Sequence, residues 1–280
     1  VPRAAASAER INAVLDTEPA IAEPAAPVQH NNWAGRIELE NLTFRYPGAQ
    51  DPVLQGLSTV IEPGMTTAIV GGTGSGKSTL VNLLPRLLDV TSGRILIDGV
   101  DVRDLALADL WNLFGIVPQK SFLFSGSIAS NIRFGKADAT DAQVWNALEI
   151  AQASEFVAGL IDGLESRVDQ GGVNFSGGQR QRLAIARCII REPLIYLFDD
   201  SFSALDYSTD ARLRGALTGQ TQGKTVIIVA QRINTVRHAG RIIVLEHGDI
   251  VGVGTHDELL ENCTAYREIA ESQAQLEAAP

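Results

Sequence analysis

A glycine-rich segment in the first third of the chain carries the residue types that bind phosphate groups. Its glycines permit a tight bend in which successive backbone N–H groups, and the start of the following helix, point at an anion. Lys77 would bring a positive charge to the β- and γ-phosphates of a nucleotide, and the Ser78 hydroxyl would be a ligand for Mg²⁺. The segment fits the pattern G-x-x-x-x-G-K-[ST] of a phosphate loop. Its residues are Gly71, Gly72, Thr73, Gly74, Ser75, Gly76, Lys77 and Ser78, with Thr79 after them.

A carboxylate at the end of an apolar segment is the second candidate for this site. Residues 194–198 read Leu-Ile-Tyr-Leu-Phe and are followed by Asp199. Ligands of open α/β folds bind at the carboxyl ends of the strands. Asp199 is therefore expected to hold Mg²⁺, either directly or through a water.

A second anion-binding segment is predicted between these two motifs. Ser176, Gly177, Gly178 and Gln179 begin a stretch of helical spacing, in which Ser176 can cap the exposed N–H groups. One chain with one nucleotide has no obvious need for two such segments. Either the second serves a nucleotide held by another chain, or it is an ordinary capped helix.

Composition argues against several classes of protein. The 280 residues contain 23 Lys and Arg against 33 Asp and Glu, a formal charge of -10, which argues against a nucleic-acid-binding face. The longest apolar runs are far shorter than the roughly 20 residues that a membrane-spanning helix needs, so no span is predicted. Cys188 and Cys263 have no metal-ligand spacing and are expected to be free thiols.

Residues 1–32 differ from the rest of the chain and are predicted to be a linker. They are rich in Ala and Pro, and residues 7–15 could form a short helix that the following prolines end. After them, short apolar segments alternate with segments of helical spacing, which predicts a parallel sheet with crossover helices. The expected strands are 37–44, 53–60, 66–70, 194–198, 226–229 and 242–245, and the expected helices are 80–88, 141–151 and 178–190.

Together, the phosphate loop, the Ser-Gly-Gly-Gln segment and Asp199 resemble the nucleotide-binding domain of an ABC transporter, over about residues 37–274. The resemblance implies an α/β fold, with a P-loop NTPase (RecA-like) core, an antiparallel β subdomain and an inserted α-helical signature subdomain at about 120–191. It implies that residues 1–32 are the linker from a transmembrane domain, and that residues 33–280 are the ATP-binding domain with ATP and Mg²⁺ as cofactors. Residues 8–18 are similar to the linker of exporters.

Further positions match the family. The resemblance implies that Tyr46 stacks on adenine, that Gln119 senses Mg²⁺ and contacts the membrane domain, and that Asp206 closes the D-loop beside the nucleotide. In the family two such domains pack head to tail, with each ATP between the phosphate loop of one and the signature of the other. The full transporter would place the domain at the cytoplasmic face of the cell membrane, with no nucleic-acid partner.

Four positions depart from the family pattern. Asp200 stands where a glutamate polarises the attacking water and is one methylene shorter, and a misplacement of about 1 Å can lower a rate on the order of 10²-fold. Gln231 stands where a switch histidine contacts the γ-phosphate, and an amide cannot become cationic. Gln170 replaces a usual glutamate in a loop that touches the membrane domain, and Phe175 replaces the usual leucine before the signature.

The two altered catalytic positions beside an intact signature favour a heterodimer. This signature would complete the partner's competent site, while Lys77 and Asp199 would retain ATP at a slow site. Two alternatives remain: an active homodimeric exporter ATPase, and a regulatory module that binds ATP without turnover. A chromosome- or repair-type ATPase is disfavoured because the about 100 residues between Lys77 and Ser176 leave no room for coiled-coil arms.

Overall fold

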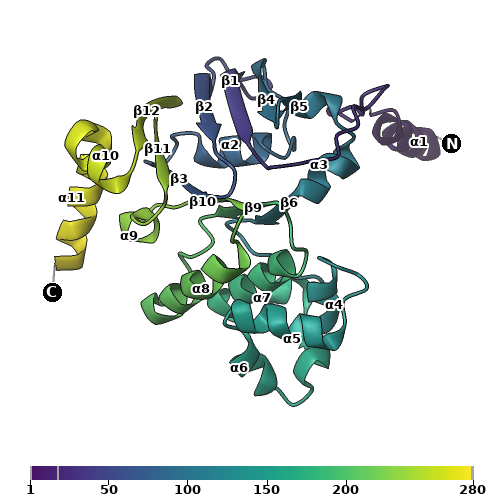
Figure 1. Cartoon of the computed structure of the whole chain (residues 1–280). Helices are drawn as coiled ribbons and strands as arrows, with labels where there is room; N and C mark the ends of the chain where they lie inside the picture. Colours follow the sequence, from purple (N-terminus) through teal and green to yellow (C-terminus); the bar gives the residue numbers. More distant parts are fainter. Residues whose placement is uncertain (1, 18, 279–280) are drawn as a thin grey trace.

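The computed structural model describes residues 2–17 and 19–278 and has a layered architecture (Figure 1). A six-stranded sheet lies in the middle, with a four-stranded antiparallel sheet and two helices on one side and a group of helices on the other. The strands are β1 (Ile37–Phe44), β2 (Leu54–Ile61), β3 (Thr66–Gly71), β4 (Ser92–Ile97), β5 (Val100–Asp101), β6 (Phe114–Val117), β7 (Gly126–Ser127), β8 (Arg167–Val168), β9 (Ile195–Asp199), β10 (Thr225–Val229), β11 (Arg241–Glu246) and β12 (Asp249–Gly254).

The helices match the predicted alternation with strands. Helices α5 and α7 confirm the helices expected at 141–151 and 178–190. The helices are α1 (Pro2–Leu15), α2 (Lys77–Leu83), α3 (Leu107–Leu113), α4 (Ile128–Arg133), α5 (Asp141–Ile150), α6 (Ser154–Ala158), α7 (Gly177–Ile189), α8 (Tyr207–Gln220), α9 (Ile233–Val236), α10 (His256–Asn262) and α11 (Thr264–Ala278), with 3₁₀ helices η1 (Val102–Asp104), η2 (Gly163–Glu165) and η3 (Gln170–Gly172).

The central sheet has the order β12-β11-β3-β10-β9-β6 and is parallel apart from β12. The antiparallel sheet has the order β2-β1-β4-β5, and β7 pairs with β8. The parallel strands expected from the sequence are therefore present and adjacent. This is the mixed α/β fold that the motifs predicted.

Both faces of the central sheet are buried, which explains its uninterrupted apolar strands. In β10, Val226 and Ile228 face the core formed with the helical side, whereas Ile227 and Val229 face the core formed with the antiparallel sheet, α2 and α3. Successive side chains of a strand point to opposite faces, so each strand contributes to both cores.

Helix α2 is shorter than the leucine spacing predicted. The spacing suggested a helix over 80–88, but α2 ends at Leu83. Two features end it: Pro85 has no N–H to continue the hydrogen-bond ladder, and Arg86 has a φ of 54°, in the left-handed region. The helix is thereby limited to the segment that directly follows the phosphate loop.

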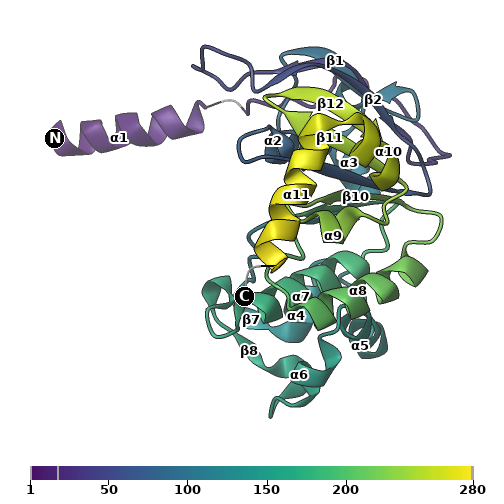
Figure 2. The same ribbon diagram turned by 90° about the vertical axis from the view of Figure 1, so that its left-hand side faces the viewer.

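The N-terminal segment includes a helix and a stretch that contacts the body of the molecule. Helix α1 confirms the short helix expected over 7–15 and projects away from the sheets (Figure 2). No helix in the described ranges is long and apolar enough to cross a membrane. Residues after α1 run back along the side of the fold that carries α3 (Figure 1).

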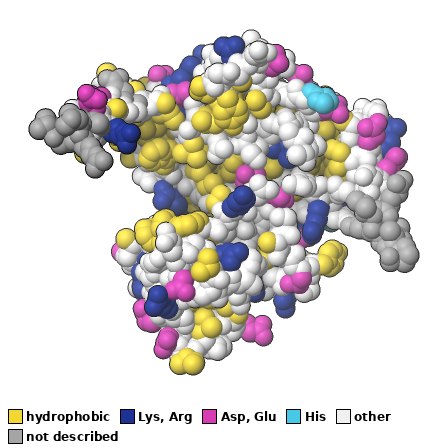
Figure 3. Space-filling model, turned by 180° about the vertical axis from the view of Figure 1, so that it is seen from behind, with side chains coloured by type: hydrophobic (Ala, Val, Ile, Leu, Met, Phe, Trp, Pro, Cys, Tyr) yellow, Lys and Arg dark blue, Asp and Glu magenta, His cyan; other side chains and the backbone are white. Residues whose placement is uncertain are grey.

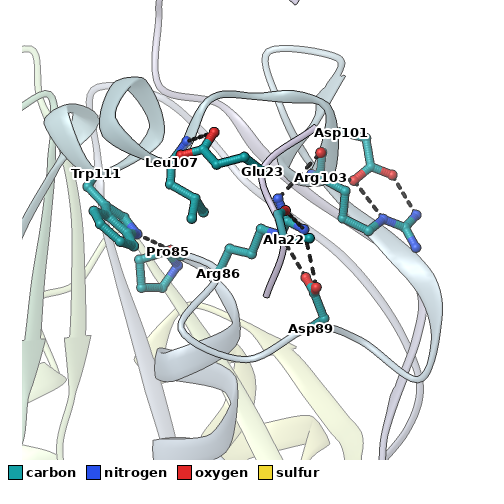
Figure 4. Close-up of polar contacts among 9 residues, drawn as sticks. All are labelled: Ala22, Glu23, Pro85, Arg86, Asp89, Asp101, Arg103, Leu107 and Trp111. Carbon is teal, nitrogen blue, oxygen red and sulfur yellow. Dashed lines mark hydrogen bonds and ion pairs between the residues drawn. The ribbon is translucent and has the colours of Figure 1, made fainter. Parts of the chain in front are cut away.

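Three polar contacts attach residues 22–28 to the body, and Figure 4 shows those of Ala22 and Glu23. The buried Arg86 donates from Nη2 to the carbonyl oxygen of Ala22 at 3.1 Å, and its guanidinium also pairs with the carboxylate of Asp89. The Glu23 carboxylate accepts from the N–H of Leu107 at 3.3 Å. Leu107 is the first residue of α3, and the residue before it, Ala106, provides no side-chain cap. The N–H of Val28 donates to the Asp104 carbonyl oxygen at 2.8 Å.

Candidate functional site

The loops that carry the predicted residues meet at one edge of the central sheet. Strands β3, β6, β9 and β10 are parallel, so their carboxyl ends lie together. Strand β3 continues into the phosphate loop, and β9 ends at Asp199, which pairs with Val229 at the end of β10. Gln119 follows β6, and Gln231 follows β10. Ligands of parallel α/β sheets bind at this edge.

Glycines and Lys77 shape the phosphate loop. Gly74 and Gly76 have φ of 82° and 98°, which other residues adopt only with strain. A Cβ atom at Gly76 would lie 2.4 Å from Cδ2 of Leu54, whereas Cβ atoms at Gly72 and Gly74 would meet nothing within 4 Å. The Lys77 ammonium donates to the carbonyl oxygens of Gly71 and Gly72 at 2.8 and 2.7 Å. The loop is therefore packed tightly on its inner side and open on its outer side.

Lys77 and Asp199 are partly buried and lie close enough for their opposite charges to interact. Burial lowers the pKa of Lys77, and the carboxylates of Asp200 and Asp199 oppose that change. Burial also raises the pKa of Asp199, the Asp200 charge raises it further, and Lys77 opposes both. The Asp199 carboxylate, whose charge is only partly compensated by Lys77, is an oxygen donor that suits a hard divalent cation. The residues present thus fit Mg²⁺ beside a polyphosphate.

The three catalytic candidates of the sequence meet at one carboxylate oxygen. Oδ2 of Asp200 accepts from Nε2 of Gln231 at 3.1 Å and from Nε2 of Gln119 at 3.3 Å. The backbone N–H of Asp200 donates to the carbonyl oxygen of Val229 at 2.9 Å, and Asp200 has a φ of 47°. Aspartate adopts this left-handed conformation more readily than most residues.

Ser201 is a site-supporting residue that the sequence did not reveal. Its side chain is fully buried, and its hydroxyl donates to the carbonyl oxygen of Val117 at 2.8 Å. It thereby ties the residue after Asp200 to the end of β6, just before Gln119. The partners are 84 positions apart, so no local pattern could indicate the contact.

Tyr46 lies beside the start of α2. Its hydroxyl is 3.1 Å from Oγ1 of Thr79, and its ring packs edge-on against Phe44 at 4.8 Å between centroids. The side chain remains 40% exposed. An aromatic ring fixed in this way, next to the phosphate loop and open to solvent, could stack on a base.

The Ser176–Gln179 segment forms a capped helix start on the helical side of the molecule. Oγ of Ser176 accepts from the N–H of Gln179 at 3.2 Å, and Oε1 of Gln179 accepts from the N–H of Ser176 at 2.9 Å. This capping box satisfies exposed donors at the start of α7. A Cβ atom at Gly178 would lie 3.2 Å from the carbonyl oxygen of Ala204. The segment therefore neighbours the D-loop (residues 203–206) at Ala204, and among the described residues its hydrogen bonds are local rather than to Lys77 or Asp199.

Phe175, which departs from the family pattern, is accommodated by the helical core. Its side chain is buried, and its ring centroid lies 6.4 Å from that of Phe156. The larger side chain thus packs inward. The signature that follows it keeps its capped geometry.

Asp206 caps α8. Its carboxylate accepts from the N–H of Thr209 at 2.9 Å and from the hydroxyl of Ser208 at 2.7 Å. These bonds, the one from the Thr209 backbone first among them, hold the pKa of Asp206 far below its usual range. The carboxylate is engaged at the helix start, and its part in nucleotide binding stays a prediction.

The Asp206→Asn variant tests this capping role through pH. Because the folded pKa is depressed, the charged carboxylate stabilises the fold above the unfolded pKa of about 3.9, and this contribution is lost as pH falls. The native chain is expected to melt at a higher temperature than the variant at pH 7, with the difference shrinking towards pH 3. Thermal unfolding followed by circular dichroism at pH 7, 5 and 3 measures it. Asp162→Asn is the control, because Asp162 precedes η2 without a side-chain cap bond. A difference independent of pH would contradict the assignment.

Gln170 lies in an exposed turn that packs beside the segment after Gln119. The N–H of Gly171 donates to the carbonyl oxygen of Leu123 at 2.9 Å, and a Cβ atom at Gly171 would be 3.7 Å from the Phe122 ring. Phe122 and Phe124 are themselves about half exposed and stack edge-on at 5.3 Å. The turn and the aromatic side chains thus form one surface.

Comparison with known proteins agrees with this arrangement. The family model "ABC transporter" matches residues 54–203. An uncharacterized ABC transporter ATP-binding protein of Mycobacterium tuberculosis is 51% identical over 98% of this chain and 47% of its own length. A putative multidrug export ATP-binding/permease protein of Bacillus subtilis is 42% identical over 84% of this chain and 40% of its own length.

A solved structure shows the same fold. A bacterial Atm1-family ABC exporter with ATP bound aligns with a TM-score of 0.92 and 35% identity, covering 98% of this chain and 48% of that chain. The chain spans about half the length of the curated relatives it matches. With a family model matching more than half of its residues and relatives this similar, the chain belongs to the ABC transporter family and contains its ATP-binding domain.

Proposed function

We propose that this chain is the ATP-binding domain of an ABC exporter, and that its own phosphate-loop site hydrolyses ATP slowly or not at all. Two such domains would pack head to tail around ATP, with a different chain as the partner. The Ser176–Gln179 signature would then complete the competent site of that partner. Domains of this family are ATPases generally, and the family relatives include exporters.

The observation that carries the slow-site proposal is the pair of hydrogen bonds that Gln119 and Gln231 donate to the Asp200 carboxylate. This carboxylate stands where a longer glutamate would act as base, and its Oδ2 accepts from both amides. The two amides hold Oδ2 of Asp200 in place, so the short carboxylate is not free to approach the water that a glutamate would polarise. Gln231 adds a neutral donor where a cation would stabilise the charge that develops on the transferred phosphoryl group.

The residues that would hold Mg²⁺ and ATP are distinct from those that would act on water. The backbone N–H groups of residues 71–78 and the Lys77 ammonium would bind the phosphates, and Tyr46 would stack on the base. Ser78, Gln119 and Asp199 would hold Mg²⁺. When bound, the metal neutralises phosphate charge. Asp200 then would orient a water, and Gln231 would donate to the γ-phosphate.

The membrane partner is proposed at the aromatic surface beside Gln119. Phe122, Phe124 and Phe134 are exposed by 44 to 62%, and the ring centroids of Phe124 and Phe134 are 4.5 Å apart. Arg187 donates to the carbonyl oxygen of Phe122 at 2.6 Å and fixes the segment. Exposed aromatic clusters of this kind mark protein interfaces. Hydrophobic side chains also gather on the face opposite to that of Figure 1 (Figure 3). The transmembrane domain, joined through residues 1–32, would dock here and hold the domain at the cytoplasmic face of the membrane.

The test is to measure ATP binding and ATP turnover on the same preparation at high protein concentration. A fluorescent ATP analogue should bind in the presence of Mg²⁺, while steady-state phosphate release stays close to the background of a protein-free control. Brisk turnover would show that Asp200 is an adequate base and would remove the main support for a heterodimer. Failure to bind any Mg²⁺–ATP would overturn the proposal as a whole.

A further inference from the structure

A side chain of α11 closes the turn that carries Gln231. Nε2 of Gln273 donates to the carbonyl oxygen of Gln231 at 2.6 Å, and Oε1 of Gln273 accepts from the N–H of Ile233 at 2.8 Å. Ile233 begins α9, and the residue before it provides no side-chain cap. A single amide from a helix some 40 positions later therefore supplies both the missing cap and a second bond across the turn.

The helix that presents Gln273 is firmly packed. Tyr266 is fully buried, and its hydroxyl lies 2.8 Å from Nδ1 of His256. Ile269 and Ala270 pack against the core of the helical side. Residues 266, 269, 270 and 273 are spaced to lie on one face of a helix. Gln273 is thus held on the same face as the anchoring residues.

Gln273 is linked to Asp200 through Gln231. The backbone of Gln231 is bonded to Gln273, and its side chain donates to Oδ2 of Asp200 at 3.1 Å. Helix α11 also borders the phosphate loop, since a cavity of about 390 Å³ is lined by residues 72–75 and by side chains of α11 that include Ile269 and Gln273. A displacement of α11 would therefore reach both the phosphate loop and the turn at 231.

We propose that Gln273 is a positioning residue for the ATPase site. By closing the turn at 231–233, it holds the side chain at position 231 within reach of Asp200 and of the transferred phosphate. The two hydrogen bonds of Gln273 are observed in the structure whatever the chain does, but their effect on catalysis rests on the proposed function. Because displacements of about 1 Å cost up to 10²-fold in rate, loss of the amide should slow hydrolysis measurably.

Two variants separate the two bonds of Gln273. Gln273→Leu removes both, whereas Gln273→Glu retains an acceptor for the N–H of Ile233 and loses the donor to the Gln231 carbonyl oxygen. Glu271→Leu, at an exposed position of the same helix, is the matched control. Each variant is compared with the native 280-residue chain. Single-turnover hydrolysis with protein in excess and a measurement of ATP affinity report on the site. NMR of the Gln231 side-chain amide and hydrogen exchange at Ile233 report on the turn.

Gln273→Leu should slow hydrolysis about tenfold, shift the Gln231 amide resonances and speed exchange at Ile233, with ATP affinity changed less than about twofold. Gln273→Glu should slow hydrolysis to a similar extent while Ile233 stays protected. Unchanged hydrolysis and unchanged Gln231 resonances in both variants would overturn the inference, even if the melting temperature falls. If the native chain binds ATP without measurable hydrolysis, the Gln231 resonances and the exchange at Ile233 decide whether Gln273 positions that residue. If it binds no ATP, the proposed function fails and the same two measurements still decide.

Discussion

The double substitution Asp200→Glu with Gln231→His should raise the steady-state rate of ATP hydrolysis on the order of 100-fold. The added methylene brings the carboxylate closer to where the water must lie, and the imidazole can become cationic beside the developing charge. The change also removes the Gln231 amide that now donates to Oδ2 of Asp200, so the longer carboxylate is free to turn towards the water.

The backbone conformation at position 200 should make the faster double variant less stable than the native chain. With a φ of 47°, Asp200 is in a region that aspartate tolerates better than glutamate. The double variant is therefore expected to unfold somewhat more easily, by about 1 kcal/mol or less. Higher turnover combined with slightly lower stability would show that the change acts at this carboxylate.

Phosphate release and ATP affinity should be measured together on the native chain and the double variant. Asp162→Glu with Gln222→His makes the same chemical changes at exposed positions and serves as the control. Affinity is expected to change little, because Lys77 and the phosphate loop are untouched. Equal turnover in native and double-variant chains would contradict the slow-site proposal and direct attention to the active homodimer.

Lys77→Ala should weaken Mg²⁺–ATP binding about 30-fold or more, because losing one partner of a desolvated charge pair costs about 2–5 kcal/mol and 1.4 kcal/mol is tenfold. Burial already lowers the pKa of Lys77, so its charge lies where water screens it poorly. Removal also takes away the cation that opposes the raised pKa of Asp199. Without this cation Asp199 should take up a proton at a higher pH. When the solution is acidified, the variant should therefore lose nucleotide binding at a higher pH than the native chain does.

Isothermal titration with Mg²⁺–ATP at pH 8 and pH 6 measures both effects. Lys224→Ala, which removes a lysine from a turn away from the phosphate loop, is the control and should bind as the native chain does. The fold should remain intact, because the hydrogen bonds that the structure describes for the Lys77 ammonium go to carbonyl oxygens of its own loop and to Oγ of Ser75. Affinity within threefold of the native value would remove the phosphate-binding role of Lys77.

Local patterns predicted those parts of the site that depend on neighbours in sequence. The phosphate loop could be placed because a strand precedes it and a helix follows it, and parallel strands bring Asp199, Gln119 and Gln231 to one edge. Cys188 and Cys263 are free thiols, as their spacing suggested. The capped start of α7 could likewise be inferred from Ser176 and Gln179 alone.

Contacts between distant segments could not be predicted. The hydroxyl of Ser201 bonds across 84 positions and the amide of Gln273 across 42, and neither residue belongs to a motif. The leucine spacing after the phosphate loop extended beyond the real end of α2 because periodicity does not register the left-handed turn at Arg86. A D-loop match also gives no sign that the carboxylate of Asp206 is already bonded to the start of α8.

The polar contacts of residues 22–28 have a practical consequence for where the domain can be cut. A shorter chain beginning at residue 33 would lack the Ala22 carbonyl oxygen and the Glu23 carboxylate, leaving the buried Arg86 and the first N–H of α3 short of partners. Leaving the buried Arg86 short of a partner costs about 1–3 kcal/mol, whereas the more exposed N–H of Leu107 can bond to water instead. Truncation before Pro19 keeps all three contacts and is the safer boundary for producing the domain alone.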